Sequence, residues 1–241
     1  FGKSGPIVMS FDAMEDYYQR QGREWERYAW IKARVVADGN GEGVRFLKKM
    51  KPFVYRRYLD FATFESFRDM KRRIEVEVKR KGMKNDIKLG PGGIREIEFF
   101  GQVFQLIRGG ILPALQERRI QKVLQILFRE GHIDEKVCEG LTSAYKFLRK
   151  TEHRLQEFAD QQTHSLPLHA EGRKRLAVSM GFDEWEPFSF QLKKHMEYVH
   201  RHFMILLEAK DRDNQADGKK KIEKRFESIG LDPIEDGKTG K

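Results

Sequence analysis

A glycine-rich loop that leads into an apolar helix is the part of the sequence best suited to chemistry. It runs from Lys88 through Gly92 and Gly93 into a helix predicted over 94–108. Glycines let backbone N–H groups approach a ligand, and the start of a helix favours anions. The pattern therefore predicts a phosphate site. The loop matches neither a Walker A motif nor a dinucleotide-binding fingerprint, because no strand precedes it in a strand–helix–strand unit.

A stripe of polar side chains runs along the otherwise apolar helix predicted over 94–108. Arg95, Glu98, Gln102 and Gln105 recur at steps of three and four residues, so they share one helix face. Burying such groups costs free energy unless they have partners. The stripe therefore either forms an internal hydrogen-bond network that fixes helix packing, or lines a cleft and contacts a ligand or a metal.

Hydrophobic periodicity predicts a mainly helical chain. The expected helices begin with Ser10 and then cover about 23–37, 42–50, 53–81, 94–108, 118–130, 134–158, 170–180 and 185–208. No β-rich region follows residue 12. From Asp211 onwards the chain is polar, as in a linker or a disordered tail. The predicted fold is a helical bundle with a short remnant of another unit in front of it.

Composition excludes several classes of protein. The 241 residues contain one cysteine, Cys138, so an internal disulfide and an all-cysteine zinc site are excluded, and this usage fits a reducing compartment. No apolar run approaches the roughly 18 residues of a transmembrane helix, and the first residues do not resemble a signal peptide. We therefore expect a cytoplasmic protein without membrane contact. The chain lacks an initiator methionine, which suggests a fragment of a longer protein.

Positive charge is concentrated between Arg45 and Lys84. This basic stretch has 14 basic against five acidic residues, a net +9 within a total of +10. Such a surface can attract phosphates, nucleic acid or an acidic partner protein, or it is simply the solvated face of a helix. Nucleic acid is not expected as a partner, because aromatic residues recur there at three-residue steps, as in a helix that packs inward.

Seven blocks of the sequence are long enough to compare with a known family. They are residues 22–28, 52–61, 88–99, 103–110, 144–149, 152–156 and 161–167. They resemble the bifunctional glutamine synthetase adenylyltransferase/adenylyl-removing enzymes of bacteria, and the resemblance covers about residues 1–208. That family has two homologous halves. The pair Arg95-Glu96 is similar to the N-terminal half, which removes adenylyl groups, because the other half tends to carry Asp in place of Glu96.

The resemblance implies a polymerase-β-like nucleotidyltransferase domain followed by a helical bundle. Residues 1–45 would then be the C-terminal remnant of the nucleotidyltransferase domain, 46–208 the helical bundle domain, and 209–241 a polar linker or disordered tail. The family's metal-binding aspartates precede the segment that matches Phe1, so no metal ligand is expected in this chain. Gly101 departs from the family, whose members carry a larger apolar residue there, and this predicts a close helix contact.

The resemblance also implies an activity, which is the regulation of glutamine synthetase by adenylylation and deadenylylation. The expected reaction of the removing half is phosphorolysis, in which orthophosphate attacks the AMP on a glutamine synthetase tyrosine and ADP leaves. Mg²⁺ would hold the phosphates in the full enzyme, with its ligands mostly outside this chain. The expected partners are glutamine synthetase, a PII signal protein, ATP or ADP, and phosphate. Without the aspartates, the chain alone is expected to be inactive.

Eight residues are candidates for the site of such an enzyme. Glu96 and Glu98 are the candidate catalytic residues, and the candidate nucleotide or phosphate ligands are Lys32, Arg34, Lys88, Gly92, Gly93 and Arg95. These assignments rest on expected helix geometry and not on known catalytic residues. For Lys32 and Arg34 the alternative is an ordinary exposed helix face. For the whole chain the alternative is a non-catalytic helical module that docks glutamine synthetase or a PII protein.

Overall fold

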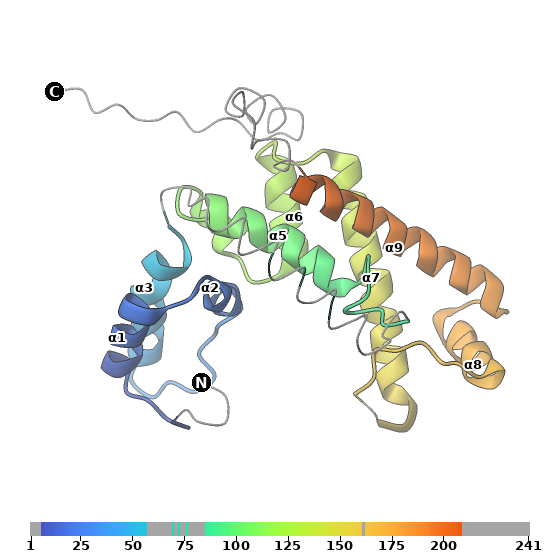
Figure 1. The fold of residues 1–241 in the computed structure, drawn as a ribbon, viewed down its shortest axis with the longest axis horizontal. Helices are drawn as coiled ribbons and strands as arrows, with labels where there is room; N and C mark the ends of the chain where they lie inside the picture. The colour runs from blue at the N-terminus through green and yellow to red at the C-terminus, as the bar shows by residue number, and fades with distance from the viewer. Residues whose placement is uncertain are drawn as a thin grey trace. The chain divides into compact units, whose positions relative to one another are not determined.

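The described part of the chain is helical (Figure 1). The computed structural model describes residues 6–56, 69, 72, 76, 85–160 and 162–208. Its helices are α1 (Phe11–Gln21), α2 (Glu24–Ile31), α3 (Glu42–Val54), α5 (Ile94–Arg108), α6 (Ile120–Arg129), α7 (Glu135–Glu157), α8 (Ala170–Met180) and α9 (Trp185–Glu208), with 3₁₀ turns η2 (Pro113–Gln116) and η3 (Phe158–Asp160). Within these residues the β pairing is limited to one antiparallel bridge between Asp86 and Ser165. The predicted fold class, mainly α, is confirmed.

The chain divides into two compact units. The first contains residues 1–72 and 102–118, and the second contains 73–101 and 119–241. Helix α5 therefore contributes its first half to the second unit and its last half to the first. The domain boundaries expected after residues 45 and 208 remain predictions. None of the helices in the described ranges has both the length and the apolar character that a membrane-spanning segment needs.

In the first unit, α1, α2 and α3 pack around Phe46, which is buried. The Ser10 side chain caps α1 by accepting the N–H of Ala13, as its position before the first apolar turn predicts. The ring of Phe11 stacks on Phe46, and the ring of Trp30 meets Phe46 edge-on. Aromatic contacts of this kind hold three short helices together that would be marginal alone.

Two helix boundaries in the first unit differ from the prediction. Helix α2 ends at Ile31 rather than near residue 37, because the N–H groups of Lys32 and Ala33 donate to the carbonyls of Ala29 and Trp30, three residues earlier, and so tighten the last turn. The Asp38 side chain instead accepts the N–H groups of Gly43 and Val44 at the start of α3. Helix α3 continues to Val54 although Pro52, which has no N–H to donate to the carbonyl four residues earlier, lies in its last turn. Most of the helix expected over 53–81, and with it most of the basic stretch, lies outside the described residues.

Tyr55, directly after α3, predicts a loss of stability at alkaline pH. Burial raises the pKa of Tyr55 to about 12. An unfolded tyrosine ionises near pH 10, so the stabilising contribution of the neutral phenol is complete below about pH 10 and is lost as the pH rises to about 12. In that window, the unfolding free energy of the wild type should fall relative to Tyr55→Phe by up to about 1.4 kcal/mol per pH unit. Urea unfolding of both proteins between about pH 10 and pH 12 checks this prediction. If the unfolding free energies of the two proteins changed with pH in the same way, the prediction would be wrong.

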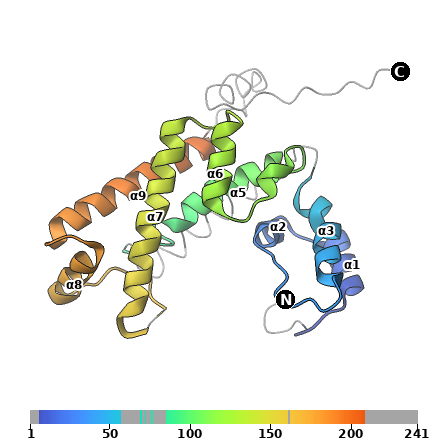
Figure 2. The ribbon, with the colours of Figure 1, turned by 180° about the vertical axis from the view of Figure 1, so that it is seen from behind.

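In the second unit, α7 is the central helix. It packs against α6, α8 and α9. Figures 1 and 2, which view the chain from opposite sides, both show α6 and α9 beside α7. On α9, Leu192, Val199, Phe203 and Leu206 recur at helical spacing and are buried. Leu148 of α7 is buried as well, and α7 and α9 pack against each other to form the core of this unit.

Gly101 makes the close helix contact that the sequence predicts. It is buried on α5, and a Cβ atom added there would lie 2.3 Å from Cδ1 of Ile120 at the start of α6. Glycine therefore lets the two helices approach, at a cost of about 1 kcal/mol in helix propensity.

The pair Gly101 and Ile120 predicts an energetic coupling. We expect Gly101→Ala to leave the free energy of unfolding of the wild type nearly unchanged. The gain in helix propensity is offset because the new methyl group displaces Cδ1 of Ile120. In an Ile120→Val background, which lacks Cδ1, the same change should raise the free energy of unfolding by about 1 kcal/mol. A double-mutant cycle by urea unfolding measures this coupling. Equal effects in the two backgrounds would show that the contact does not matter.

Candidate functional site

The loop before α5 is fastened at its base by Asp86, which is 1% exposed. The Asp86 carboxylate accepts the N–H groups of Lys88 and Leu89, each at 2.8 Å. The Ile87 N–H donates to the His164 carbonyl at 2.9 Å, next to the bridge between Asp86 and Ser165. These bonds fix the direction in which Lys88 leaves the backbone and bring it close to the segment over 162–168.

Gly92 packs closely against α9, whereas Gly93 packs against carbonyls of the loop itself. Gly92 has φ +74°, and a Cβ atom there would lie 1.9 Å from the Met196 carbonyl oxygen. The N–H of Gly92 donates to the Glu96 carboxylate at 2.9 Å, and the N–H of Gly93 donates to the Gly90 carbonyl at 2.9 Å. The N–H groups expected to face a phosphate thus already have partners, Glu96 of α5 and a loop carbonyl. Their role as phosphate ligands stays a prediction.

Glu96 joins the loop to α9. Its two oxygens lie 3.2 and 3.0 Å from Nδ1 of His200, and one of them also accepts the Gly92 N–H. Glu96 therefore faces α9 and links it to the loop, and its catalytic role stays a prediction.

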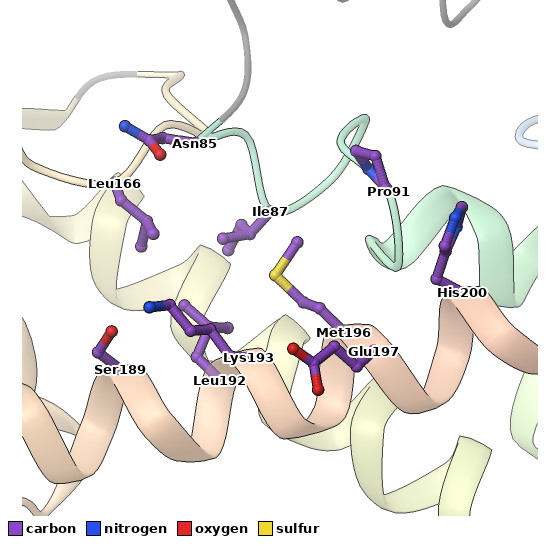
Figure 3. Close-up of a pocket in the computed structure, with 10 residues that line it drawn as sticks. All are labelled: Asn85, Ile87, Pro91, Leu166, Ser189, Leu192, Lys193, Met196, Glu197 and His200. Atoms are coloured by element: carbon purple, nitrogen blue, oxygen red, sulfur yellow. The ribbon is translucent and has the colours of Figure 1, made fainter.

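A pocket of about 290 Å³ lies next to this contact. Figure 3 shows Ile87 of the loop opposite Met196 of α9, so the floor of the pocket is apolar. Its rim carries Lys193, Glu197 and His200.

On the α7 side of the loop, a buried carboxylate gathers three basic side chains. Glu152 is 1% exposed and forms an ion pair with Arg149, one turn earlier on α7. Lys88 Nζ lies 3.4 Å from Glu152 Oε1, and His164 Nδ1 lies 3.2 Å from the same oxygen. Lys88 Nζ is also 3.5 Å from His164 Nε2. We call Lys88, Arg149, Glu152 and His164 the Glu152 cluster.

Tyr145 and Glu98 continue this cluster towards α5. Tyr145, Arg149 and Glu152 recur at steps of four and three along α7, so they share a face. The pKa of Tyr145 is raised, chiefly by burial and then by the nearby Glu98 carboxylate, while Arg149 acts in the opposite direction. Glu98 also pairs with Arg95 at 3.3 Å. The structure therefore groups Lys88, Arg95 and Glu98 on the α7 side of the loop, away from Glu96.

The polar stripe predicted on α5 divides into two parts. Gln105 is 1% exposed, and its amide donates to the Leu115 and Glu117 carbonyls, each at 2.6 Å. Gln105 is thus bonded internally, as one of the two interpretations predicts for the whole stripe, whereas Oε1 of the buried Gln102 has no hydrogen-bond partner among the described residues. Arg95 and Glu98, by contrast, form a partly exposed ion pair at the start of the helix.

Lys32 and Arg34 belong to the first unit, whereas the other six candidates belong to the second. Both lie after the end of α2, and not on a helix as predicted. The Lys32 ammonium donates to the Arg118 carbonyl at 2.7 Å, and Arg34 is exposed. A cleft that contains all eight residues stays a prediction. Over the described ranges, no group of three or more His, Cys, Asp or Glu side chains is arranged to hold a metal ion.

Sequence reasoning missed Arg149, Glu152 and His164 as site residues. The available signal was the position of Glu152, because Leu148 and Leu155 on the same helix are buried. A carboxylate on an apolar helix face is rarely buried without a partner. The pattern could therefore have indicated a buried ion pair, although it could not have named Lys88 or His164 as the partners.

The fold and the site define a helical protein that holds a basic cluster beside the glycine loop of a buried helix. Residues 68–207 match the family model described as GlnD PII-uridylyltransferase, and residues 1–49 match the model described as glutamate-ammonia ligase adenylyltransferase. Because the first match covers more than half of the 241 residues, the chain belongs to the GlnD PII-uridylyltransferase family.

Curated relatives confirm the resemblance seen in the sequence. Proteins from Nitrosococcus oceani, Thioalkalivibrio sulfidiphilus and Pseudomonas aeruginosa are 55%, 51% and 48% identical to this chain over 212, 209 and 217 residues. These matches cover 88%, 87% and 90% of this chain and 22% of each relative. All three are named bifunctional glutamine synthetase adenylyltransferase/adenylyl-removing enzyme. The chain thus spans about a fifth of the length of these relatives.

Proposed function

We propose that this chain is the helical part of an enzyme that regulates glutamine synthetase by adenylylation and deadenylylation. The observation that carries the proposal is the 55% identity over 212 residues to a relative of that name. The match of residues 1–49 to a glutamate-ammonia ligase adenylyltransferase model supports it independently. It also supports a nucleotidyltransferase remnant at the start of the chain.

Within that enzyme, we assign the chain to the half that removes adenylyl groups. Glu96 supports this assignment, since the other half of the family tends to carry Asp there. The Glu96 side chain reaches both the Gly92 N–H and the His200 ring, and an aspartate would be one methylene shorter.

The proposed reaction is phosphorolysis. An oxygen of orthophosphate attacks the phosphorus of the tyrosyl-AMP diester, the bond to the tyrosine oxygen breaks, the tyrosine takes up a proton, and ADP leaves. Lys88 and Arg95 are suited to stabilise phosphate charge, because their side chains are 32% and 45% exposed and therefore accessible. Glu98 would position Arg95 through their ion pair. The described residues do not offer a ligand set that fits Mg²⁺, so we derive no step of the reaction through a metal.

A chimera tests this function. This chain would replace the matching 212-residue segment of the Nitrosococcus oceani relative, and ADP release from adenylylated glutamine synthetase would be measured with phosphate present. We expect the chimera to release ADP and this chain alone to release none. Lys88→Met with Arg95→Met should reduce ADP release by about 100-fold, as for the loss of two charge-assisted contacts.

Adenylyl transfer onto glutamine synthetase by the same chimera is the control reaction. It should be unchanged by Lys88→Met with Arg95→Met, because we assign these residues to the removing half. If transfer falls and removal does not, the chain belongs to the other half. If neither reaction responds, Lys88 and Arg95 have no role in catalysis.

A further inference from the structure

We propose that the Glu152 cluster is a binding site for a phosphoryl dianion, with Lys88, Arg149 and His164 as the groups that contact it and Glu152 as the group that positions them. The proposal deepens the proposed function and rests on it for the choice of substrate class. Its geometry and its binding test are independent of any enzymatic activity.

The first argument is the depth of each charge. The Glu152 side chain is 2% exposed, while the side chains of Lys88, Arg149 and His164 are 32%, 37% and 23% exposed. The carboxylate therefore lies beneath the three basic groups, and they face solvent. A ligand that approaches this surface meets basic groups first.

The second argument is the number of donors. A guanidinium has five N–H donors and an ammonium has three, whereas the single carboxylate beneath them has two oxygens. Arg149 donates to Glu152 through Nη1, which leaves most of its donors for another acceptor. His164 Nδ1 lies 3.2 Å from a Glu152 oxygen but is buried and makes no hydrogen bond to any described residue, so it is not counted among the donors open to a ligand. The cluster thus has more donors than acceptors.

The third argument is rigidity, because each basic group is held in place before a ligand arrives. Lys88 follows the turn that Asp86 closes, His164 is adjacent to the bridge at Ser165, and Arg149 is on the central helix α7. Positioned charges bind more tightly than free ones, because less side-chain freedom is lost on binding.

The shape of the cluster selects the ligand class. Three basic side chains come from three separate segments, and a carboxylate ligand has only two oxygens to offer them. A phosphoryl dianion has at least three oxygens and two charges, so one group can contact all three side chains. Such a dianion can come from orthophosphate or from the terminal phosphate of a nucleotide.

Calorimetric titration of the 241-residue chain with orthophosphate and, separately, with ADP tests the site at low ionic strength. We expect saturable binding of at least one of them. Lys88→Met and Arg149→Met should each weaken that binding by about tenfold or more. Lys146→Met removes an exposed lysine from the same helix, α7, and should leave the affinity unchanged. Orthophosphate binding identifies the free anion as the ligand, and binding of ADP alone identifies the nucleotide phosphate.

A second variant separates a loss of binding from a loss of folding. Lys88→Met with Glu152→Gln removes one charge of each sign, so it keeps the net charge and leaves no unpaired buried carboxylate. It should keep the helical circular dichroism of the wild type and still bind at least tenfold more weakly. If this variant bound as tightly as the wild type, the weaker binding of the single variants would be due to their lower net charge alone, and the proposal would be overturned. Absence of saturable wild-type binding of either ligand would overturn it as well.

The outcomes separate this proposal from the proposed function. Cluster-dependent phosphate binding together with a chimera that releases no ADP would retain the anion site and reject the activity. ADP release by the chimera without cluster-dependent binding would retain the activity and reject the site.

Discussion

Replacing Gly92 with alanine should lower the free energy of unfolding of the second unit by roughly 3–5 kcal/mol, through backbone strain and overpacking together. Gly92 has φ +74°, a conformation that alanine adopts at a cost. The new Cβ atom would also lie 1.9 Å from the Met196 carbonyl oxygen and 2.7 Å from its Cα. Since those are backbone atoms of α9, rotation of a side chain cannot relieve the clash. Urea unfolding measures the loss.

Gly131 is the matched control for this prediction. It has nearly the same backbone angle, φ +73°, but no atom lies within 4 Å of the position of its Cβ. Gly131→Ala should therefore cost only the conformational strain, about 1–2 kcal/mol. The difference between the two variants isolates the contact with α9. Equal losses would show that Gly92 is required only for its backbone angle.

Replacing both Lys88 and Arg149 with methionine should destabilise the second unit by about 3–5 kcal/mol, because it leaves the Glu152 carboxylate buried with His164 as its one remaining partner in the cluster. Glu152 is 1% exposed, so the carboxylate does not recover hydration while the unit stays folded. The cost therefore comes from an uncompensated charge more than from the ion pairs themselves. Chemical unfolding of the double variant and the wild type measures it.

Adding Glu152→Gln to that double variant provides the decisive comparison. Without the charge, most of the lost stability should return, even though one further native side chain has been removed. By contrast, Glu152→Gln alone should lower the free energy of unfolding only slightly, because the side chains of Lys88 and Arg149 are about one-third exposed and can turn to solvent. If the triple variant is no more stable than the double, packing of the Lys88 and Arg149 stems accounts for the effect.

These predictions concern two faces of one loop. On one face Gly92 and Glu96 hold it against α9, and on the other Lys88 reaches the buried carboxylate of α7. A loop fixed on both faces presents Lys88 in a defined position, which a binding site for a small anion requires. Gly92→Ala should accordingly weaken the interaction of Lys88 with Glu152 without touching either residue.

Local patterns in the sequence were sufficient to predict where the helices of the second unit begin and end. The helices expected over 94–108, 170–180 and 185–208 have the observed bounds, because apolar periodicity and helix-ending residues act within a few positions. The same reasoning placed the helix that contains Lys32 and Arg34 too far along the chain. There α2 ends in a tighter turn, in which the N–H groups of Lys32 and Ala33 donate to carbonyls three residues earlier.

The resemblance carried by sequence blocks and the close contact at Gly101 were also evident before the structure. Which polar groups meet, by contrast, could be learned only from the folded chain. The N–H groups of the glycine loop look available for a phosphate in the sequence, yet loop carbonyls and Glu96 occupy them. Glu152 pairs with Lys88 and His164, which come from segments distant in the sequence. The partners of a buried charge depend on which segments the fold brings together, and no pattern within a single helix contains that information.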